Sequence, residues 1–170
     1  VDDRLHRYAV ALDKKTAFLI HSSEMGDWAT NPAVAKIAHD AKAIARENGI
    51  TGITFDTSLA AYLVNPGVRT QELKDIQERW GDGSAINQLT PEQELLSSAR
   101  ALFALKESLT RELKERNLWE LYTSMELPVA DLLAEAISPY APILLPMRAE
   151  AAGEPRITLT APVLAAAKNI

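Results

Sequence analysis

The start of the chain shows two short runs of apolar and polar positions that suit extended strands. HRYAVALD and TAFLIH, residues 6–13 and 16–21, are rich in β-branched, aromatic and alanine residues, and the polar pair Lys14-Lys15 lies between them. Runs of this length and composition on either side of a polar connection predict a β-hairpin. The connecting residues are not the Asn-Gly or Asp-Gly pair that two-residue turns favour.

The next stretch alternates strand-like and helix-like segments. In chain order we expect a helix capped by Asn31 with Pro32 in its first position, a short strand at 36–39, a helix at 40–48 ended by Gly49, a strand at 50–56, and a helix at 58–64 stopped by Asn65-Pro66-Gly67. This alternation predicts an α/β fold, with a mixed or parallel sheet flanked by helices.

The second half of the chain has mainly helical periodicity. Residues 70–81 place Leu73, Ile76 and Trp80 on one face. Thr90 and Pro91 are typical of a helix start, and the sequence after them continues for more than 25 residues without a breaker. Residues 118–136 predict a further helix, which Pro128 should kink or restart. We therefore expect a helical C-terminal half.

The last residues change composition again. Four of the nine prolines lie in residues 137–155, which predicts a mostly extended connector. Residues 156–170, RITLTAPVLAAAKNI, suggest a strand followed by a short alanine-rich helix. We therefore divide the chain into a main domain at 1–136 and a tail at 137–170, which can complete the same domain.

Composition narrows the classes of protein. The 170 residues suit one domain, and their net charge of −5 argues against a strong generic grip on nucleic acid. The absence of cysteine excludes a disulfide framework, a Cys-ligated zinc and a thiol nucleophile, and it fits a cytoplasmic location. No apolar run approaches the ~20 residues that span a bilayer, and the start VDDRLHR lacks a signal-peptide core.

Two longer strings carry a family resemblance. KIAHDAKAIARENGITGITFDTSLAAYLVNPGVRTQELKDIQERW begins at Lys36, and LWELYTSMELPVADLLAE begins at Leu118. In order and separation they resemble the proofreading (3′–5′ exonuclease) domain of bacterial DNA polymerase I, a family A polymerase, over residues 8–136. The resemblance implies a ribonuclease H-like fold. Active members of that family cut single-stranded DNA with two divalent metals held by carboxylates, and the metals stabilise the attacking and leaving oxygens.

Most of the family's metal ligands are not found at the matching positions. The second motif's aspartate corresponds to Asp40. The only candidate for the first motif, an Asp-x-Glu, is Asp13, with Lys15 where the glutamate would stand. The third motif's tyrosine and aspartate fall near Ser98 and Leu102. The resemblance therefore implies a degenerate nuclease domain without a metal cofactor, with a structural or DNA-contacting role in replication and repair. DNA would be a weak partner, in the context of a polymerase domain.

Other interpretations of the same residues remain open. Asp40 suits a helix N-terminus, and Asp56 suits a strand-end cap for the helix that follows. His39 and Asp40 are neighbours in sequence and do not face one another on a helix. Trp28, Trp80 and Trp119 suit core and edge positions better than base stacking. Lys36, Lys42 and Arg46, with Lys14 and Lys15, could face phosphates or form a solvated surface.

Two rival functions follow from these alternatives. An active Mg²⁺- or Mn²⁺-dependent exonuclease would need Asp13, Asp40 and Asp56 as unusual ligands. A protein-interaction module would use the same fold without nucleic acid. The tail bears on the fold in either case, because residues 156–161 resemble the strand that precedes the family's first motif. Placed in the sheet beside residues 8–13, they would complete it.

Overall fold

The structure is a computed structural model that describes residues 7–68, 71–81, 89–129 and 163–166. Its elements, in chain order, are β1 (Arg7–Ala11), β2 (Ala17–His21), the short helix η1 (Ser22–Glu24), β3 (Lys36–Ala38), α1 (Ala41–Asn48), β4 (Ile53–Asp56), α2 (Thr57–Val64), α3 (Leu73–Trp80), α4 (Pro91–Glu115), α5 (Trp119–Leu121), the π-helical turn η2 (Tyr122–Glu126) and β5 (Val163–Ala166).

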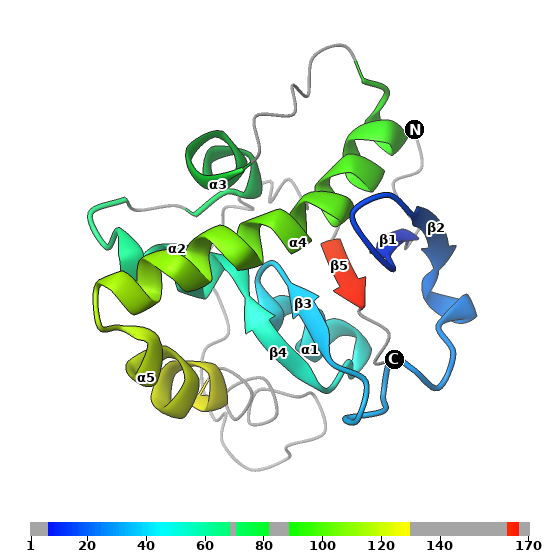
Figure 1. Cartoon of the computed structure of the whole chain (residues 1–170). Coiled ribbons are helices and arrows are strands. Elements are labelled where there is room, and N and C mark those ends of the chain that lie inside the picture. The colour runs from blue at the N-terminus through cyan, green and yellow to red at the C-terminus, as the bar shows by residue number, and fades with distance from the viewer. Residues whose placement is uncertain (1–6, 69–70, 82–88, 130–162, 167–170) are drawn as a thin grey trace, which may run out of the picture.

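The strands form one mixed sheet in the order β2-β1-β5-β3-β4 (Figure 1). β1 pairs antiparallel with β2, which confirms the predicted hairpin. β5 lies between β1 and β3, parallel to β1 and antiparallel to β3, while β3 and β4 are parallel. The expected α/β class with a mixed sheet is therefore confirmed.

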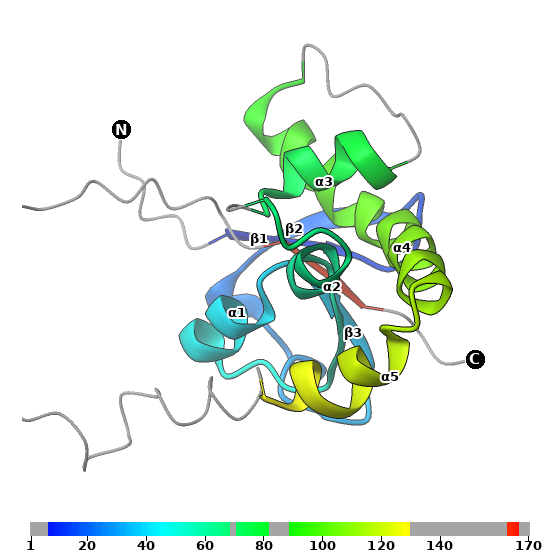
Figure 2. The same ribbon diagram turned by 90° about the vertical axis from the view of Figure 1, so that its left-hand side faces the viewer.

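Helices cover both faces of the sheet, as Figures 1 and 2 show for α4 and α1. On one face, α2, α3, α4 and Tyr122 share a core with Ala9, Ile37 and Phe55 from three strands. On the other face, α1 packs with the segments before β3 and before β4 around Ile44 and Ile53. This arrangement agrees with a ribonuclease H-like domain.

α4 is the long helix that the sequence predicts. The Thr90 hydroxyl accepts a hydrogen bond from the Gln93 backbone N–H, and the Gln93 side chain accepts one from the Thr90 N–H, which forms a capping box. Its buried stripe, spaced at three and four residues, packs along the sheet and consists of Ala99, Leu102, Leu105, Leu109 and Leu113.

The turn between β1 and β2 closes without the usual Asn-Gly or Asp-Gly pair because a side chain bonds its backbone. The Asp13 carboxylate accepts hydrogen bonds from the backbone N–H groups of Lys15, at 2.7 Å, and Thr16, at 2.6 Å. An aspartate side chain that closes its own turn in this way replaces the glycine that tighter turns need.

The helix expected at Asn31 is not present, and this prediction was wrong. The Asn31 side chain accepts from the Ala33 N–H at 2.9 Å and closes a turn. The Pro32 and Val34 carbonyls pack against Gly52, whose φ is +73° and where an added Cβ would lie 2.9 and 2.8 Å from them. This close approach of two backbone segments keeps residues 31–35 out of a helix.

The tail also departs from expectation. Val163–Ala166 forms strand β5, where an alanine-rich helix was predicted, because it fills a gap between two sheet strands. Residues 156–161, the expected strand, lie outside the described residues. The tail nevertheless contributes a strand beside β1, and the proposed division at residue 136 stays a prediction.

The helix before the tail departs from α geometry just ahead of Pro128. In η2 the Leu127 N–H donates to the Tyr122 carbonyl, five residues back. Proline has no N–H and its ring crowds the carbonyl four residues earlier, which is that of Ser124. A wider π turn relieves this crowding, so the expected perturbation takes the form of a π turn.

Candidate functional site

The candidate site lies where β3 and β4 end and α1 and α2 begin. Ala38 and Asp56 pair at the last register position of these parallel strands. His39 and Asp40 follow β3, and Thr57 follows β4. Carboxyl ends of parallel strands meet at one edge of a sheet, where ligand and catalytic groups commonly gather.

Asp56 is the centre of this edge. Its Oδ1 accepts from the backbone N–H groups of Ser58 at 2.8 Å, Asp40 at 3.2 Å and Leu59 at 3.3 Å, and its Oδ2 accepts from Ala41 at 2.9 Å. One carboxylate therefore caps α2 and also holds the start of α1. Burial raises the pKa of Asp56 to about 6, because desolvation outweighs the stabilising N–H donors.

Asp40 serves as the cap of α1. It is exposed and adopts a left-handed backbone conformation with φ 58°, and its side chain accepts from the Ala43 N–H at 3.3 Å. Aspartate is among the residues that tolerate this conformation. The interpretation of Asp40 as a helix N-terminal acid is confirmed.

His39 is held as a neutral ring. Its Nδ1 lies 3.0 Å from the Thr57 Oγ1, and that hydroxyl can donate to the Ala38 carbonyl at 3.3 Å. Under this arrangement His39 Nδ1–H donates to Thr57. Burial lowers the pKa of His39 to about 4, while the charge of Asp40 acts in the opposite direction. His39 is thus bonded to Thr57, and its ring forms no dyad with Asp40.

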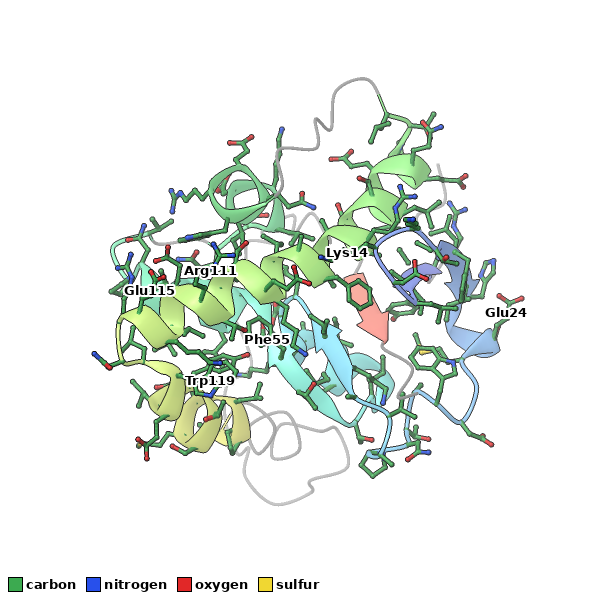
Figure 3. The ribbon with its side chains drawn as sticks, viewed as in Figure 1. Lys14, Glu24, Phe55, Arg111, Glu115 and Trp119 are labelled. Carbon is green, nitrogen blue, oxygen red and sulfur yellow. The ribbon has the colours of Figure 1, made fainter. Side chains whose placement is uncertain are left out.

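Tyr122 joins the site from a distant part of the chain. Its hydroxyl accepts from the Asp56 N–H at 2.7 Å and donates to the Asp56 carbonyl at 3.2 Å. The ring packs between Phe55, at a centroid distance of 5.2 Å, and Trp119, at 5.9 Å, and both of these side chains are labelled in Figure 3. Burial raises the pKa of this hydroxyl. The Tyr122 hydroxyl therefore satisfies both backbone groups of Asp56, the last residue of the edge strand β4.

Asp13 lies at the other end of the sheet. β1 runs parallel to β5 and β5 runs antiparallel to β3, so the residue that follows β1 lies opposite those that follow β3 and β4. The two N–H donors of its own turn hold the pKa of Asp13 below its usual value. The three carboxylates of the active-nuclease alternative thus do not converge.

The third-motif positions belong to the core. Ser98 and Leu102 lie on the face of α4 that packs on the sheet, with 8% and 0% of their surfaces exposed. In the described ranges no group of three His, Asp or Glu side chains could hold a metal ion. The donors present therefore do not fit the two-metal arrangement of the active family members.

Lys36 corrects one of the predicted phosphate contacts. Its side chain is fully buried, and its ammonium group donates to the carbonyls of Thr51 at 2.7 Å, Val34 at 2.9 Å and Asn31 at 3.0 Å. It cannot reach a phosphate because three backbone carbonyls enclose it. Burial also lowers the pKa of Lys36.

The other basic candidates have different surroundings. Lys42 is exposed on α1, and the backbone of Arg46 belongs to the same helix. Lys14, which is labelled in Figure 3, forms an ion pair with Glu107 of α4 at 2.8 Å. Trp28, Trp80 and Trp119 are half-buried against the two cores, as the core interpretation expected.

Sequence reasoning missed two features of this region. The buried Lys36 had no signal beyond its position in a strand of otherwise apolar residues. Tyr122 could have been singled out as an aromatic residue on the apolar face of the last helix, although its partner could not.

No helix in the described part of the chain has the length and apolar character to cross a bilayer.

Comparison with known proteins finds relatives among the DNA polymerase I proteins and domains. The family described as DNA polymerase I, ribonuclease H-like domain, matches residues 6–88. The chain is 32% identical over 161 residues to the DNA polymerase I of Mycobacterium tuberculosis (strain H37Rv), covering 82% of this chain and 18% of that protein. It is 29% identical over 136 residues to the DNA polymerase I of Bacillus subtilis, covering 68% of this chain and 16% of that protein. The chain thus spans less than a fifth of the length of these relatives.

A solved structure has a similar fold over much of the chain. The POL domain of Pol1 from M. smegmatis, in complex with DNA primer-template and dNTP, superposes with a TM-score of 0.60 at 31% identity. The match covers 72% of this chain and 23% of that one.

Proposed function

Because the chain belongs to the family of DNA polymerase I ribonuclease H-like domains, we propose that it is a catalytically silent 3′–5′ exonuclease-like domain of a DNA polymerase I-type protein. Its role is structural or DNA-contacting, within replication and repair in the cytoplasm, and it needs no metal.

The separation of the carboxylates carries this proposal. Two-metal hydrolysis needs ions about 3.5–4 Å apart, each held by anionic oxygens. Asp56 is buried under four backbone N–H donors, Asp40 caps α1, and Asp13 closes a turn at the other end of the sheet. A carboxylate committed to backbone N–H groups has fewer lone pairs left for a cation. This arrangement favours a domain without nuclease activity over the active-nuclease alternative.

The DNA-contacting part of the proposal rests on a relative that is bound to a primer-template. The acidic net charge makes binding by this chain alone weak, because phosphate contacts depend on Lys and Arg. Lys42 is the exposed cation nearest the candidate site on α1, so it is the residue through which a contact can be tested.

One pair of assays tests both parts. The chain and its Asp40→Ala variant are incubated with a labelled single-stranded oligonucleotide and Mg²⁺ or Mn²⁺. We expect no digestion by either protein, and metal-dependent digestion that disappears in the variant would overturn the proposal.

Single-strand binding is then measured against salt concentration. Lys42→Ala should weaken binding and reduce the salt slope by about one phosphate contact. The matched control is Lys74→Ala, which removes an exposed cation from α3, on the other face of the sheet, and should leave the slope unchanged. Loss of slope in the control but not in Lys42→Ala would contradict this contact.

A further inference from the structure

β5 occupies an unusual position in the sheet. It lies between β1 and β3, and residues 130–162 connect it to the rest of the chain. Ala9 pairs with Val163 on one side and Lys36 pairs with Ala166 on the other. We call this position between β1 and β3 the strand slot. Within the described residues, backbone pairing with β1 and β3 and packing against α4 hold its occupant in place.

The strand slot offers one parallel and one antiparallel neighbour to a strand of either direction. Because β1 and β3 run in opposite directions, any strand between them has one parallel and one antiparallel neighbour. Reversing the occupant exchanges the two partners and preserves both kinds of pairing. The slot therefore does not select its occupant by chain direction.

The strand slot cannot stand empty. The residues of β1 and β3 that face it are among the most buried in the protein: Ala9, Ala11, Lys36 and Ala38 are all 0% exposed. Removing β5 without replacement would leave two rows of buried backbone groups unpaired, and each unpaired group costs about 1–3 kcal/mol. Departure of β5 is therefore coupled to the arrival of another strand.

The slot favours a small, uncharged segment. The residues that pair with its occupant are mostly small or apolar, and α4 packs against β5 from one side; the paired residues are Ala9, Val10 and Ala11 of β1 and Lys36, Ile37 and Ala38 of β3. The Val-Leu-Ala-Ala sequence of β5 meets this requirement. A second copy of the chain carries the same segment, and that makes it the best matched external source.

From these observations we propose that the strand slot is a strand-acceptor site with an exchangeable occupant, and that a second copy of this chain supplies the incoming Val163–Ala166 strand. The chain's own β5 competes from within because it belongs to the same molecule, so exchange between copies should increase with protein concentration up to the mM range.

The first test uses the full chain with Leu164→Pro, which places a residue without an N–H in the centre of the sheet. A fluorescent peptide with the sequence of residues 160–170 should bind this variant at least tenfold more tightly than it binds the unaltered chain. A scrambled peptide is the control. Failure of the folded variant to bind, or equal binding of the scrambled peptide, would overturn the acceptor site.

A second measurement covers the case in which the variant does not fold. Excess unlabelled peptide is added to the ¹⁵N-labelled unaltered chain, and amide signals of β1 and β3 should shift while those of β2 and β4 change less. Absence of such shifts at mM peptide would refute the acceptor site.

Exchange between copies is followed separately by light scattering. Dimer should increase as the unaltered chain approaches mM concentration and should be lost in Leu164→Pro. A chain that stays monomeric up to several mM rules out the second copy as the source.

Discussion

The hydroxyl of Tyr122 hydrogen-bonds both backbone groups of Asp56, although 66 residues separate the two. β4 is the last strand of the sheet, so the outward groups of Asp56 have no strand partner. A single hydroxyl acts as donor to one group and acceptor from the other. This contact ties the C-terminal helical segment to the edge that carries Asp56 and His39.

Replacing Tyr122 with phenylalanine should destabilise the protein without changing its shape. The ring can keep its contacts with Phe55 and Trp119, but a buried N–H and carbonyl lose their partner. We expect a loss of about 2–4 kcal/mol in the free energy of unfolding, measured by urea denaturation.

Tyr62→Phe is the matched control, because Tyr62 is 51% exposed. Its effect should stay within about 0.5 kcal/mol. Equal effects of the two variants would mean that the bonds to Asp56 contribute nothing.

The pH dependence of stability should reveal two opposing groups. Asp56 has its pKa raised from 3.8 to about 6, so its stabilising contribution is present below pH 3.8 and is lost as pH rises through 6. His39 has its pKa lowered from 6.5 to about 4, so its contribution is present above pH 6.5 and is lost as pH falls through 4. In the intact chain the two slopes largely cancel between pH 4 and 6.

Replacing one of the two residues at a time should reveal the pH dependence of stability that the other contributes. With His39→Asn, stability should fall by a few kcal/mol as pH rises from 4 to 6, and with Asp56→Asn it should rise over the same interval. Thermal or urea unfolding at several pH values gives the slopes directly. Parallel pH profiles for the two variants would contradict the assignment.

Gly52→Ala should be among the most destabilising of small substitutions. The residue has a positive φ, and an added Cβ would lie 2.8 Å from the Val34 carbonyl oxygen. Both effects act against the folded state, so we expect a loss of more than about 2 kcal/mol. Gly67→Ala is the control, since its nearest neighbour atom would be 3.7 Å away. A comparison of the melting temperatures of Gly52→Ala and Gly67→Ala tests this expectation.

Lys36→Met should destabilise the protein even though it removes a buried charge. Methionine fills similar space but leaves the carbonyls of Asn31, Val34 and Thr51 without their donor. We expect a loss of about 3 kcal/mol, because orphaned buried acceptors cost more than the net value of a hydrogen bond. Lys42→Met on the surface of α1 should change the denaturation midpoint little.

Local signals predicted most of the elements. Thr90 with Pro91 marks the start of α4, Gly49 ends α1, and two strand-like runs on either side of Lys14-Lys15 give the hairpin. These features depend on neighbours within a few residues, so sequence alone contains them. The role of Asp56 as a cap is predictable for the same reason.

The features that sequence could not provide depend on distant partners. Alanine is the best helix former, so Val163–Ala166 suggests a helix until β1 and β3 are known to leave a gap beside it. Asn31 and Pro32 suggest a helix start until Gly52 is seen to pack on the same segment. Tyr122 and Asp56 meet only in the finished fold.

The central position of β5 bears on how fast the chain folds. β1 and β2 pair across a short turn, whereas β5 joins β1 and β3 only after most of the intervening chain has been brought together. The entropy of closing so large a loop is lost before the new pairing returns any stability. Non-local pairing of this kind lowers folding rates. The sheet should therefore assemble from its two flanks, with β1–β2 and β3–β4 formed early and the centre closing last.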